Sequence, residues 1–429
     1  MLKLSGLAAE LQKEIVQLPV IDTHEHLPTE AERVAKKVDV TTFLSHYCRA
    51  DLESAGLAGL DVLQEKHEVL DTSKPLLPRW KKLKPYYEAI RHGSYAWPGL
   101  AYVRDVLGFD DINDSTVEAI SQKLQADNKP GLYKKIFQKL CRIEKAIQCK
   151  EGVEQDQPFF VYLCRDRTCR DYEPGPNLGA RIAQMESLSG RAIHTLADFV
   201  DVLGWYVGDQ KRRGAVGLKV GCAYRRTIEF ADVSAGDADR VFVKTRASMT
   251  PVVSEAEQEA LENYLIRREV EACIEHDLPV AIHTGYQAGI GNDIRNARAT
   301  LLWSLLHSYP QARFDLFHGS FPYVSDMTVL GKYFPNVVLN MCWMHIMGPD
   351  VSRRALSEWL DAVPVTKIFA FGGDFLVVEE VYGHLQLAQA DVAAVLAEKV
   401  QCGRMTETDA LHVARLLFYE NPKRWYRLG

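Results

Sequence analysis

The sequence predicts an α/β fold: a (β/α)8 TIM barrel with a large, mostly helical insertion after its first strand. Three observations support this prediction. Eight short segments are apolar and rich in β-forming residues, amphipathic helical patterns separate most of them, and ionisable residues recur where these segments end. Near-continuous apolar strands alternating with amphipathic helices are typical of a parallel sheet covered by helices. Eight such units are the number that closes a barrel.

The predicted strands follow one another at fairly even spacing. The first is LPVID (18–22), followed by CRIEKAIQC (141–149) and PFFVYLC (158–164). From about residue 190 the alternation is regular, with strands predicted at 215–221, 278–285, 312–319, 336–343 and 366–374. Helical patterns at 254–276 and 296–310 separate three of these strands, and 406–428 has the pattern of a closing helix.

One gap interrupts the spacing. Residues 28–140 contain no convincing strand but several helical stretches, including 84–109 and a segment that begins with the N-cap candidates Asp114 and Ser115. We expect 28–140 to be a helical insertion that covers the mouth of the barrel. A chain of 429 residues is long enough for two or three domains, but barrels use such a length as one unit, so we expect residues 1–429 to form a single unit.

The composition narrows the class of protein. Hydrophobic residues make up 47% of the chain and charged residues 25%, which is ordinary for a soluble globular protein. The net charge of −6 gives no basic footprint, so we expect no nucleic-acid partner. No run of eighteen apolar residues and no compact N-terminal signal core is present, and we expect no membrane association. Nine scattered cysteines without a CxxC pair favour reduced thiols and a cytoplasmic location.

Ionisable residues recur at the C-terminal ends of the predicted strands, at His24, His26, Lys219, His283, His318 and Asp374. Side chains alternate along an extended strand, so His24 and His26 point the same way. Taken singly, each residue has an ordinary structural alternative: a hydrogen-bonded histidine, an ion-paired lysine or a helix-capping aspartate. Because strand ends converge at one mouth of a barrel, their joint placement predicts a site for a divalent metal ion, most naturally zinc.

The pattern resembles the amidohydrolase superfamily, and most closely its amidohydrolase-2 branch. The matching motifs are DTHEH, HTG, FHGS and GGD at the first, fifth, sixth and eighth strands. The insertion, with GSYAWPGLAYVRDVLGF, also resembles uronate isomerases and the amidohydrolase-like domains fused to glutamine synthetases. The resemblance implies that His24, His26 and Asp374 bind the metal and that His283 completes or bridges the site.

For two residues the resemblance implies alternatives. His318 would bind a second metal ion or, in a one-metal site, act as base or electrophile. Lys219 would be carboxylated and bridge two ions, or it would bind a substrate anion. One or two ions are therefore expected, and Asp374 and His318 are the catalytic candidates.

The function that follows is a metal-dependent hydrolase, which uses a metal-activated water to cleave a C–N or ester-like bond in a small anionic substrate. Asp374 would take the proton of that water and pass it to the leaving group. Three alternatives stay open: a decarboxylase or lyase of the same branch, a sugar-acid isomerase like the uronate isomerases, and a non-catalytic binding or regulatory barrel. The presence of both His283 and His318 counts against the isomerase. Self-association of the chain is left open.

Several residues are candidates for contact with the substrate. Arg225 and Arg226 follow the fourth strand, and a guanidinium group offers a carboxylate two parallel hydrogen bonds. Residues of the insertion that would roof the pocket are Tyr86, Tyr87, Arg91 and Trp97. The alternatives are a solvated loop for the arginines and core packing for the aromatic residues. Gln287, between Gly285 and Gly289, suggests a loop that passes close to the ligand.

Overall fold

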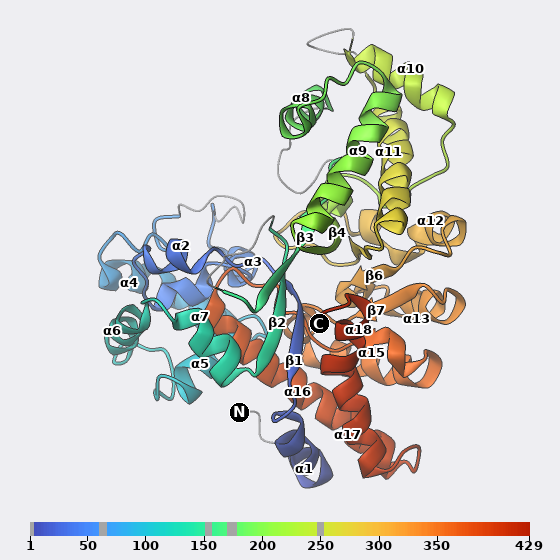
Figure 1. Ribbon diagram of the computed structural model, residues 1–429. Helices are drawn as coiled ribbons and strands as arrows, with labels where there is room; N and C mark the ends of the chain where they lie inside the picture. The colour runs from blue at the N-terminus through green and yellow to red at the C-terminus, as the bar shows by residue number, and fades with distance from the viewer. Residues whose placement is uncertain (1–3, 60–66, 151–156, 170–177, 247–252) are drawn as a thin grey trace.

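The computed structural model describes residues 4–59, 67–150, 157–169, 178–246 and 253–429. Within them, eight parallel strands form one sheet in sequential order, each hydrogen-bonded to the next (Figure 1). The strands are β1 (Val20–Glu25), β2 (Ile143–Gln148), β3 (Phe160–Arg165), β4 (Ala215–Val220), β5 (Val280–His283), β6 (Phe314–Phe317), β7 (Val337–Asn340) and β8 (Ile368–Phe369). The predicted (β/α)8 barrel is confirmed.

The two ends of the sheet meet through the chain that follows β8. Only two residues of β8 pair regularly with β7, although the sequence predicted a strand to residue 374. The backbone N–H of Thr23 donates to the carbonyl of Phe371 (3.2 Å), and the N–H of Asp374 donates to the carbonyl of His24 (2.8 Å). Asp374 is therefore held directly against β1, beside the two histidines of that strand.

Helices cover the outside of the barrel and fill the insertion. The α-helices before β3 are α1 (Gly6–Ile15), α2 (Glu30–Val34), α3 (Cys48–Ser54), α4 (Leu76–Ile90), α5 (Trp97–Asp105), α6 (Val117–Asp127) and α7 (Leu132–Lys134). Those after β3 are α8 (Leu178–Ser189), α9 (Leu196–Arg212), α10 (Ala235–Arg246), α11 (Glu255–Glu275), α12 (Trp303–Ser308), α13 (Val324–Tyr333), α14 (Met344–Met347), α15 (Pro349–Ala362), α16 (Val378–Gln401), α17 (Glu407–Arg415) and α18 (Asn421–Trp425). Short 3-10 and π segments are η1 (Val40–Leu44), η2 (Lys135–Leu140), η3 (Cys222–Tyr224), η4 (Ile294–Ala297), η5 (Ala299–Leu302), η6 (His318–Ser320), η7 (Val365–Lys367) and η8 (Leu416–Glu420).

Between β1 and β2, residues 26–59 and 67–142 form helices and loops but no strand. The expected capping of α6 by Asp114 or Ser115 is wrong: Thr116 is the N-cap residue, without a side-chain cap bond. Asp114 instead accepts hydrogen bonds from Trp80 and Lys84, which removes it from the helix end. Whether the insertion acts as a cover over the barrel stays a prediction at this point.

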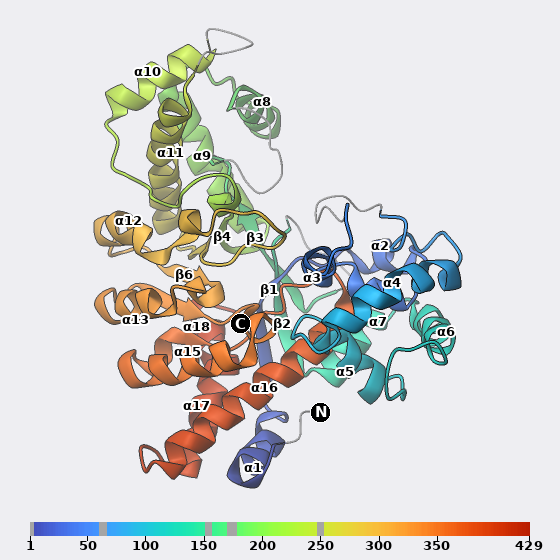
Figure 2. The same cartoon turned by 180° about the vertical axis from the view of Figure 1, so that it is seen from behind.

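The sequence did not predict a helical arm on one side of the barrel. In Figures 1 and 2, α8, α9, α10 and α11 extend away from the strands near β3 and β4. The two long helices of this arm, α9 and α11, begin with capping boxes at Thr195 and Ser254, in which N-cap and N3 side chains satisfy each other's backbone N–H. The pattern predicted at 254–276 is confirmed as α11.

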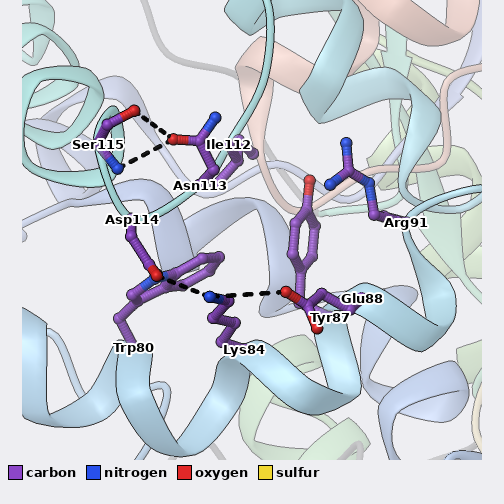
Figure 3. A pocket seen from close by; sticks show the side chains of 9 residues that line it. All are labelled: Trp80, Lys84, Tyr87, Glu88, Arg91, Ile112, Asn113, Asp114 and Ser115. Atoms are coloured by element: carbon purple, nitrogen blue, oxygen red, sulfur yellow. Dashed lines mark hydrogen bonds and ion pairs between the residues drawn. The ribbon is translucent and has the colours of Figure 1, made fainter.

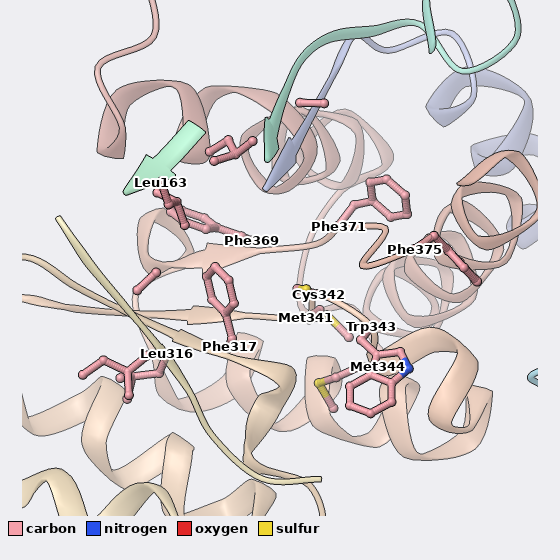
Figure 4. Packing of buried hydrophobic residues seen from close by; sticks show 14 of the residues in the cluster. Leu163, Leu316, Phe317, Met341, Cys342, Trp343, Met344, Phe369, Phe371 and Phe375 are labelled. Carbon is pink, nitrogen blue, oxygen red and sulfur yellow. The ribbon is translucent and has the colours of Figure 1, made fainter. Parts of the chain in front are cut away.

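The barrel interior supplies an apolar floor beneath the ends of the strands (Figure 4). Leu163, Phe317 and Phe369 are each fully buried there. Burying side chains of this size stabilises the fold by about 1.5–3 kcal/mol each. Phe317 lies directly under the candidate site, because the ring of His24 packs edge-on against it at 4.7 Å between centroids. None of the described helices has the length and apolarity needed to span a membrane.

Candidate metal centre

Two histidines of β1 and the aspartate after β8 form a compact cluster. His24 Nε2 and His26 Nε2 each lie 3.3 Å from Asp374 Oδ1. One donor atom from each of the three residues lies within 4.8 Å of the others, close enough to bind one ion. The alternation of side chains along β1 places both imidazoles on this side of the strand.

A second group of donors shares Asp374. It contains His318, after β6, and Cys342, after β7, and their donor atoms also lie within 4.8 Å of one another. His318 Nδ1 donates to the carbonyl of Cys342 at 3.2 Å and lies 3.7 Å from Asp374 Oδ2. That bond leaves Nε2 of His318 as the nitrogen with the lone pair. Cys342 was not predicted from the sequence, because a single cysteine inside an apolar strand gives no metal-binding signal.

His283 and Lys219 complete the ring. The imidazoles of His283 and His318 lie 4.4 Å apart between centroids, and His283 Nε2 donates to the carbonyl of Tyr286 at 2.9 Å. Lys219 is buried on β4, and its Nζ lies 3.7 Å from the ring centroid of Phe317. Among the residues that the structure describes, none forms a hydrogen bond with this Nζ. All six strand-end residues predicted from sequence are thus brought to one place.

The electrostatics favour neutral imidazoles, the form that binds metals. Burial, and next the charge of Lys219, lowers the pKa of His24 and of His26 well below the usual value. The same two causes lower the pKa of His283 to about 3. Burial likewise lowers the pKa of Lys219.

The residues present fit a divalent ion. Neutral imidazoles with one carboxylate are the donors that zinc prefers, with tetrahedral or open coordination. The buried polar atoms around the cluster that have no hydrogen-bond partner in the described structure include His24 Nδ1, His318 Nε2 and Lys219 Nζ. Buried polar atoms are almost always paired, so unpaired ones at a single place indicate a missing ion, water or ligand.

The backbone at the ends of three successive strands adopts a left-handed conformation. His318, Trp343 and Asp374, which follow β6, β7 and β8, have φ values of +66°, +67° and +60°. Residues other than glycine adopt this conformation at a cost of order 1–3 kcal/mol each, and such residues cluster at active sites. The strained turns aim all three side chains at the common centre.

Two buried carboxyl groups of β1 hold the turn that carries Asp374. Asp22 accepts from the backbone N–H of Gly373 at 3.0 Å, and Glu25 accepts from that of Phe375 at 2.9 Å. Burial raises the pKa of both carboxyl groups, that of Asp22 to about 6. A Cβ on Gly373 would lie only 1.9 Å from Glu25 Oε1, so glycine is required there.

The insertion does reach the site, but through residues that the sequence analysis missed. Tyr47 donates to the carbonyl of Asp374 at 2.6 Å, and its ring stacks on those of Trp343 (4.7 Å) and Tyr95 (5.3 Å). Trp343 in turn stands edge-on to the imidazole of His318 at 5.4 Å. In the sequence, these aromatic residues could not be distinguished from ordinary core residues.

The arginine expected to bind substrate needs a correction. Arg226 is buried, pairs with Glu262 at 3.1 Å and donates to Asn263 and to the carbonyls of Thr227, Glu229 and Glu259. The guanidinium of Arg226 is therefore occupied by contacts within the protein. Arg225 is exposed after η3.

Another arginine stands beside the cluster. Arg165 of β3 lies opposite Lys219 of β4 in the register of the two parallel strands, which places both side chains on the same face of the sheet. The charge of Arg165 contributes to the lowered pKa of His26, after burial, Lys219 and His46. Because it directly follows an apolar run at a strand end, the rule that found Lys219 could have found Arg165 too.

The predicted roof residues of the insertion make contacts elsewhere. Arg91 pairs with Asp111, and together with the buried Tyr87 it lines a separate cavity of about 260 Å³ inside the insertion (Figure 3). Trp97 packs beneath Arg104, and Tyr86 is half-buried against the apolar core. None of these contacts joins the metal ligands, so the expected roof role is corrected in favour of Tyr47 and Tyr95.

The loop after β5 runs close to the rest of the rim. Gly285 has φ +74°, and a Cβ there would lie 2.4 Å from the backbone of Ser320. Gln287 is buried and donates to the carbonyl of Ala223 at 2.8 Å. The close backbone approach expected from the glycines is present, whereas contact of this loop with a ligand stays a prediction.

Comparison with known proteins agrees with this geometry. Residues 218–428 match the model of a family described as amidohydrolase. The chain belongs to the amidohydrolase superfamily. Members of this superfamily depend on metal ions, which is consistent with the two candidate groups of metal ligands.

Two curated proteins are similar to the amidohydrolase chain in sequence. Protein fluG of Emericella nidulans is 26% identical over 226 residues, which cover 50% of this chain and 26% of fluG. A uronate isomerase of Phenylobacterium zucineum is 23% identical over 288 residues, covering 62% of this chain and 59% of that enzyme. The chain thus spans about a quarter of the first relative's length and less than two thirds of the second's.

Solved structures share the fold over almost the whole chain. A uronate isomerase from Thermotoga maritima superposes with a TM-score of 0.80 at 14% identity, covering 98% of this chain and 97% of the other. A glucuronate isomerase from Caulobacter crescentus gives 0.75 at 18% identity, covering 99% and 94%. A protein described as a metal-dependent hydrolase from Lactobacillus casei gives 0.66 at 17%, covering 97% of each chain. At these identities the likeness shows the fold alone.

Proposed function

We propose that this amidohydrolase is a zinc-dependent hydrolase that cleaves a C–N or ester-like bond in a small molecule with an anionic group. The supporting observation is that Asp374 is shared by two groups of metal ligands, one with His24 and His26 and the other with His318 and Cys342. A divalent ion bound there would polarise the substrate's carbonyl and acidify a water molecule. An isomerase needs no such water.

The chain's own residues would divide the remaining work. Asp374 Oδ2, on the side of His318, would take a proton from the attacking water and return it to the leaving group, a transfer worth about 10²–10⁴-fold. His318 presents an Nε2 lone pair, which suits a metal ligand or a base better than the electrophile considered from the sequence. Lys219 and Arg165, side by side on β4 and β3, would hold the substrate's anionic group.

The test uses purified protein loaded with zinc and a panel of small amides and esters. We expect about one or two equivalents of bound metal and incorporation of ¹⁸O from labelled water into the product. His24→Ala should lose both metal and turnover, whereas His412→Ala, a change of an exposed histidine on α17, should lose neither. Full turnover by metal-free protein, or a product without ¹⁸O, would contradict the proposal.

A sugar-acid isomerase is the second candidate. It is favoured by the likeness to uronate and glucuronate isomerases across 98–99% of the chain. Conversion of glucuronate to a ketose acid without uptake of ¹⁸O would establish it. Release of carbon dioxide in the same assay would instead indicate the decarboxylase alternative.

We also propose that the protein works in the reducing cytoplasm. None of the nine cysteines forms a disulfide, and eight of them are buried, as expected of a protein in a reducing compartment.

A further inference from the structure

A second cavity lies beside the metal centre, between helix α3 of the insertion and the loop after β5. It has a volume of about 320 Å³ and is lined by Ala50, Asp51, Ser54, Tyr286, Gln287, Gly289, Ile290, Gly291, Asn292 and Ile294. Tyr286 links it to the metal centre, because its carbonyl accepts from His283 and its ring lies 5.5 Å from that of Trp343. The cavity is therefore an outer extension of the candidate active site.

The residues that line this cavity carry negative charge only. Asp51 is the single charged residue among the ten that line it. Within the described part of the chain, its half-buried carboxylate has no ion pair or side-chain hydrogen bond, and burial raises its pKa. A partly buried, uncompensated carboxylate costs free energy, and a cation bound beside it would reduce that cost.

An aromatic ring lines the cavity together with this carboxylate. Tyr286 is the aromatic residue among the ten that line it, and its ring lies 5.5 Å from that of Trp343. A cavity that offers a carboxylate and an electron-rich ring suits organic ammonium groups, which bind through charge and through the face of the ring.

We infer that the substrate carries an ammonium group at the end that lies away from the metal ligands, and that Asp51 and the ring of Tyr286 bind this group. The inference rests on the proposed function, because it places the scissile bond at the metal ligands. Combined with an anion beside Arg165 and Lys219, it indicates a zwitterionic substrate, such as an amide or ester derived from an amino acid.

The test measures binding of three probes to the zinc-loaded, full-length protein by calorimetry: benzylammonium, the uncharged benzyl alcohol and the anion benzoate. We expect benzylammonium to bind about tenfold more tightly than benzyl alcohol, as for a hydrogen bond between charged groups. Asp51→Asn keeps the shape of the side chain and should abolish this preference. Glu53→Gln makes the same change of charge on α3 outside the cavity lining and should leave it intact.

Three outcomes would overturn the inference: no preference for benzylammonium, tightest binding of benzoate, or a preference that survives in Asp51→Asn. Failure of the proposed function is recognised separately, by metal content and by uptake of ¹⁸O. If the protein hydrolyses amides with a bound metal but prefers those without an ammonium group, the inference about the substrate is wrong and the hydrolase stands. If Asp51-dependent ammonium binding is found without hydrolysis, the distal site stands and the hydrolase is wrong.

Discussion

The rim of the barrel and the cavity inside the insertion both gather charged and aromatic side chains, but they treat the charges differently. In the insertion, the ammonium of Lys84 lies 2.6 Å from Asp114, so charge is paired with charge (Figure 3). Single buried atoms without a hydrogen-bond partner occur in both regions, for example Tyr87 Oη in the insertion and His318 Nε2 at the rim. The difference is that, among the described residues, the amino group of Lys219 at the rim is buried without an ion pair. A buried ionisable group without an opposite charge, more than the density of charge, marks where a ligand belongs.

The strongest test of the rim is removal of its shared carboxylate. Asp374→Asn should lower turnover by about 10³-fold or more, because it removes both a metal ligand and the proposed proton acceptor. Metal analysis and single-turnover kinetics would measure the two losses separately. A variant that keeps its turnover would mean that Asp374 is structural, like the paired acids of the insertion.

A buried charge that is already paired should matter for folding. Arg226→Met would remove one of the two arginines that pair with the buried Glu262, while Arg181 would keep its own contact at 3.2 Å. It would also leave Asn263 without the hydrogen bond that Arg226 donates, and we expect a loss of about 1.5–3 kcal/mol in the free energy of unfolding. Denaturant titration would measure it. Arg354→Met, at an exposed position on α15, should change stability by less than about 0.5 kcal/mol. If the Arg226 variant bound substrate more weakly at unchanged stability, Arg226 would contact the substrate after all.

The turn that carries Asp374 should tolerate no added side chain. Gly373→Ala would press a methyl group against Glu25, with an expected cost of about 1–3 kcal/mol and a displaced Asp374. Gly236→Ala, on α10 with no atom within 4 Å of the new methyl, is the matched control and should be neutral or stabilising. Thermal melts together with metal affinity would show whether the turn positions the site.

The smallest effect is expected inside the insertion. Arg91→Met breaks a partly exposed pair with Asp111, which should cost only about 0–1 kcal/mol. Turnover should stay unchanged, since Arg91 makes no contact with the metal ligands. A tenfold loss of turnover would instead show that the insertion cavity is part of the active site, and the contrast between the two regions would no longer hold.

Much of the metal centre could be predicted because its information is local. The alternation of side chains in β1 places His24 and His26 together, and the end of each apolar run marks the rim. Both features can be recognised from neighbouring residues, without knowing which side chains meet in the folded protein. The same local pattern does not distinguish Arg226 from Arg165, two arginines near the ends of neighbouring strands. Only their surroundings in the folded protein decide that Arg226 is enclosed and that Arg165 faces the cluster.

By itself, the sequence determined the barrel, the rim and the ligands that strand periodicity aligns, since these follow from the order of residues along the chain. Tertiary structure alone decided the rest. Tyr47 meets Asp374 across 327 residues, and Glu25 and Asp22 hold the turn at Gly373 from the opposite end of the sheet. Such contacts depend on distance in the folded molecule, which a pattern of neighbouring residues does not encode.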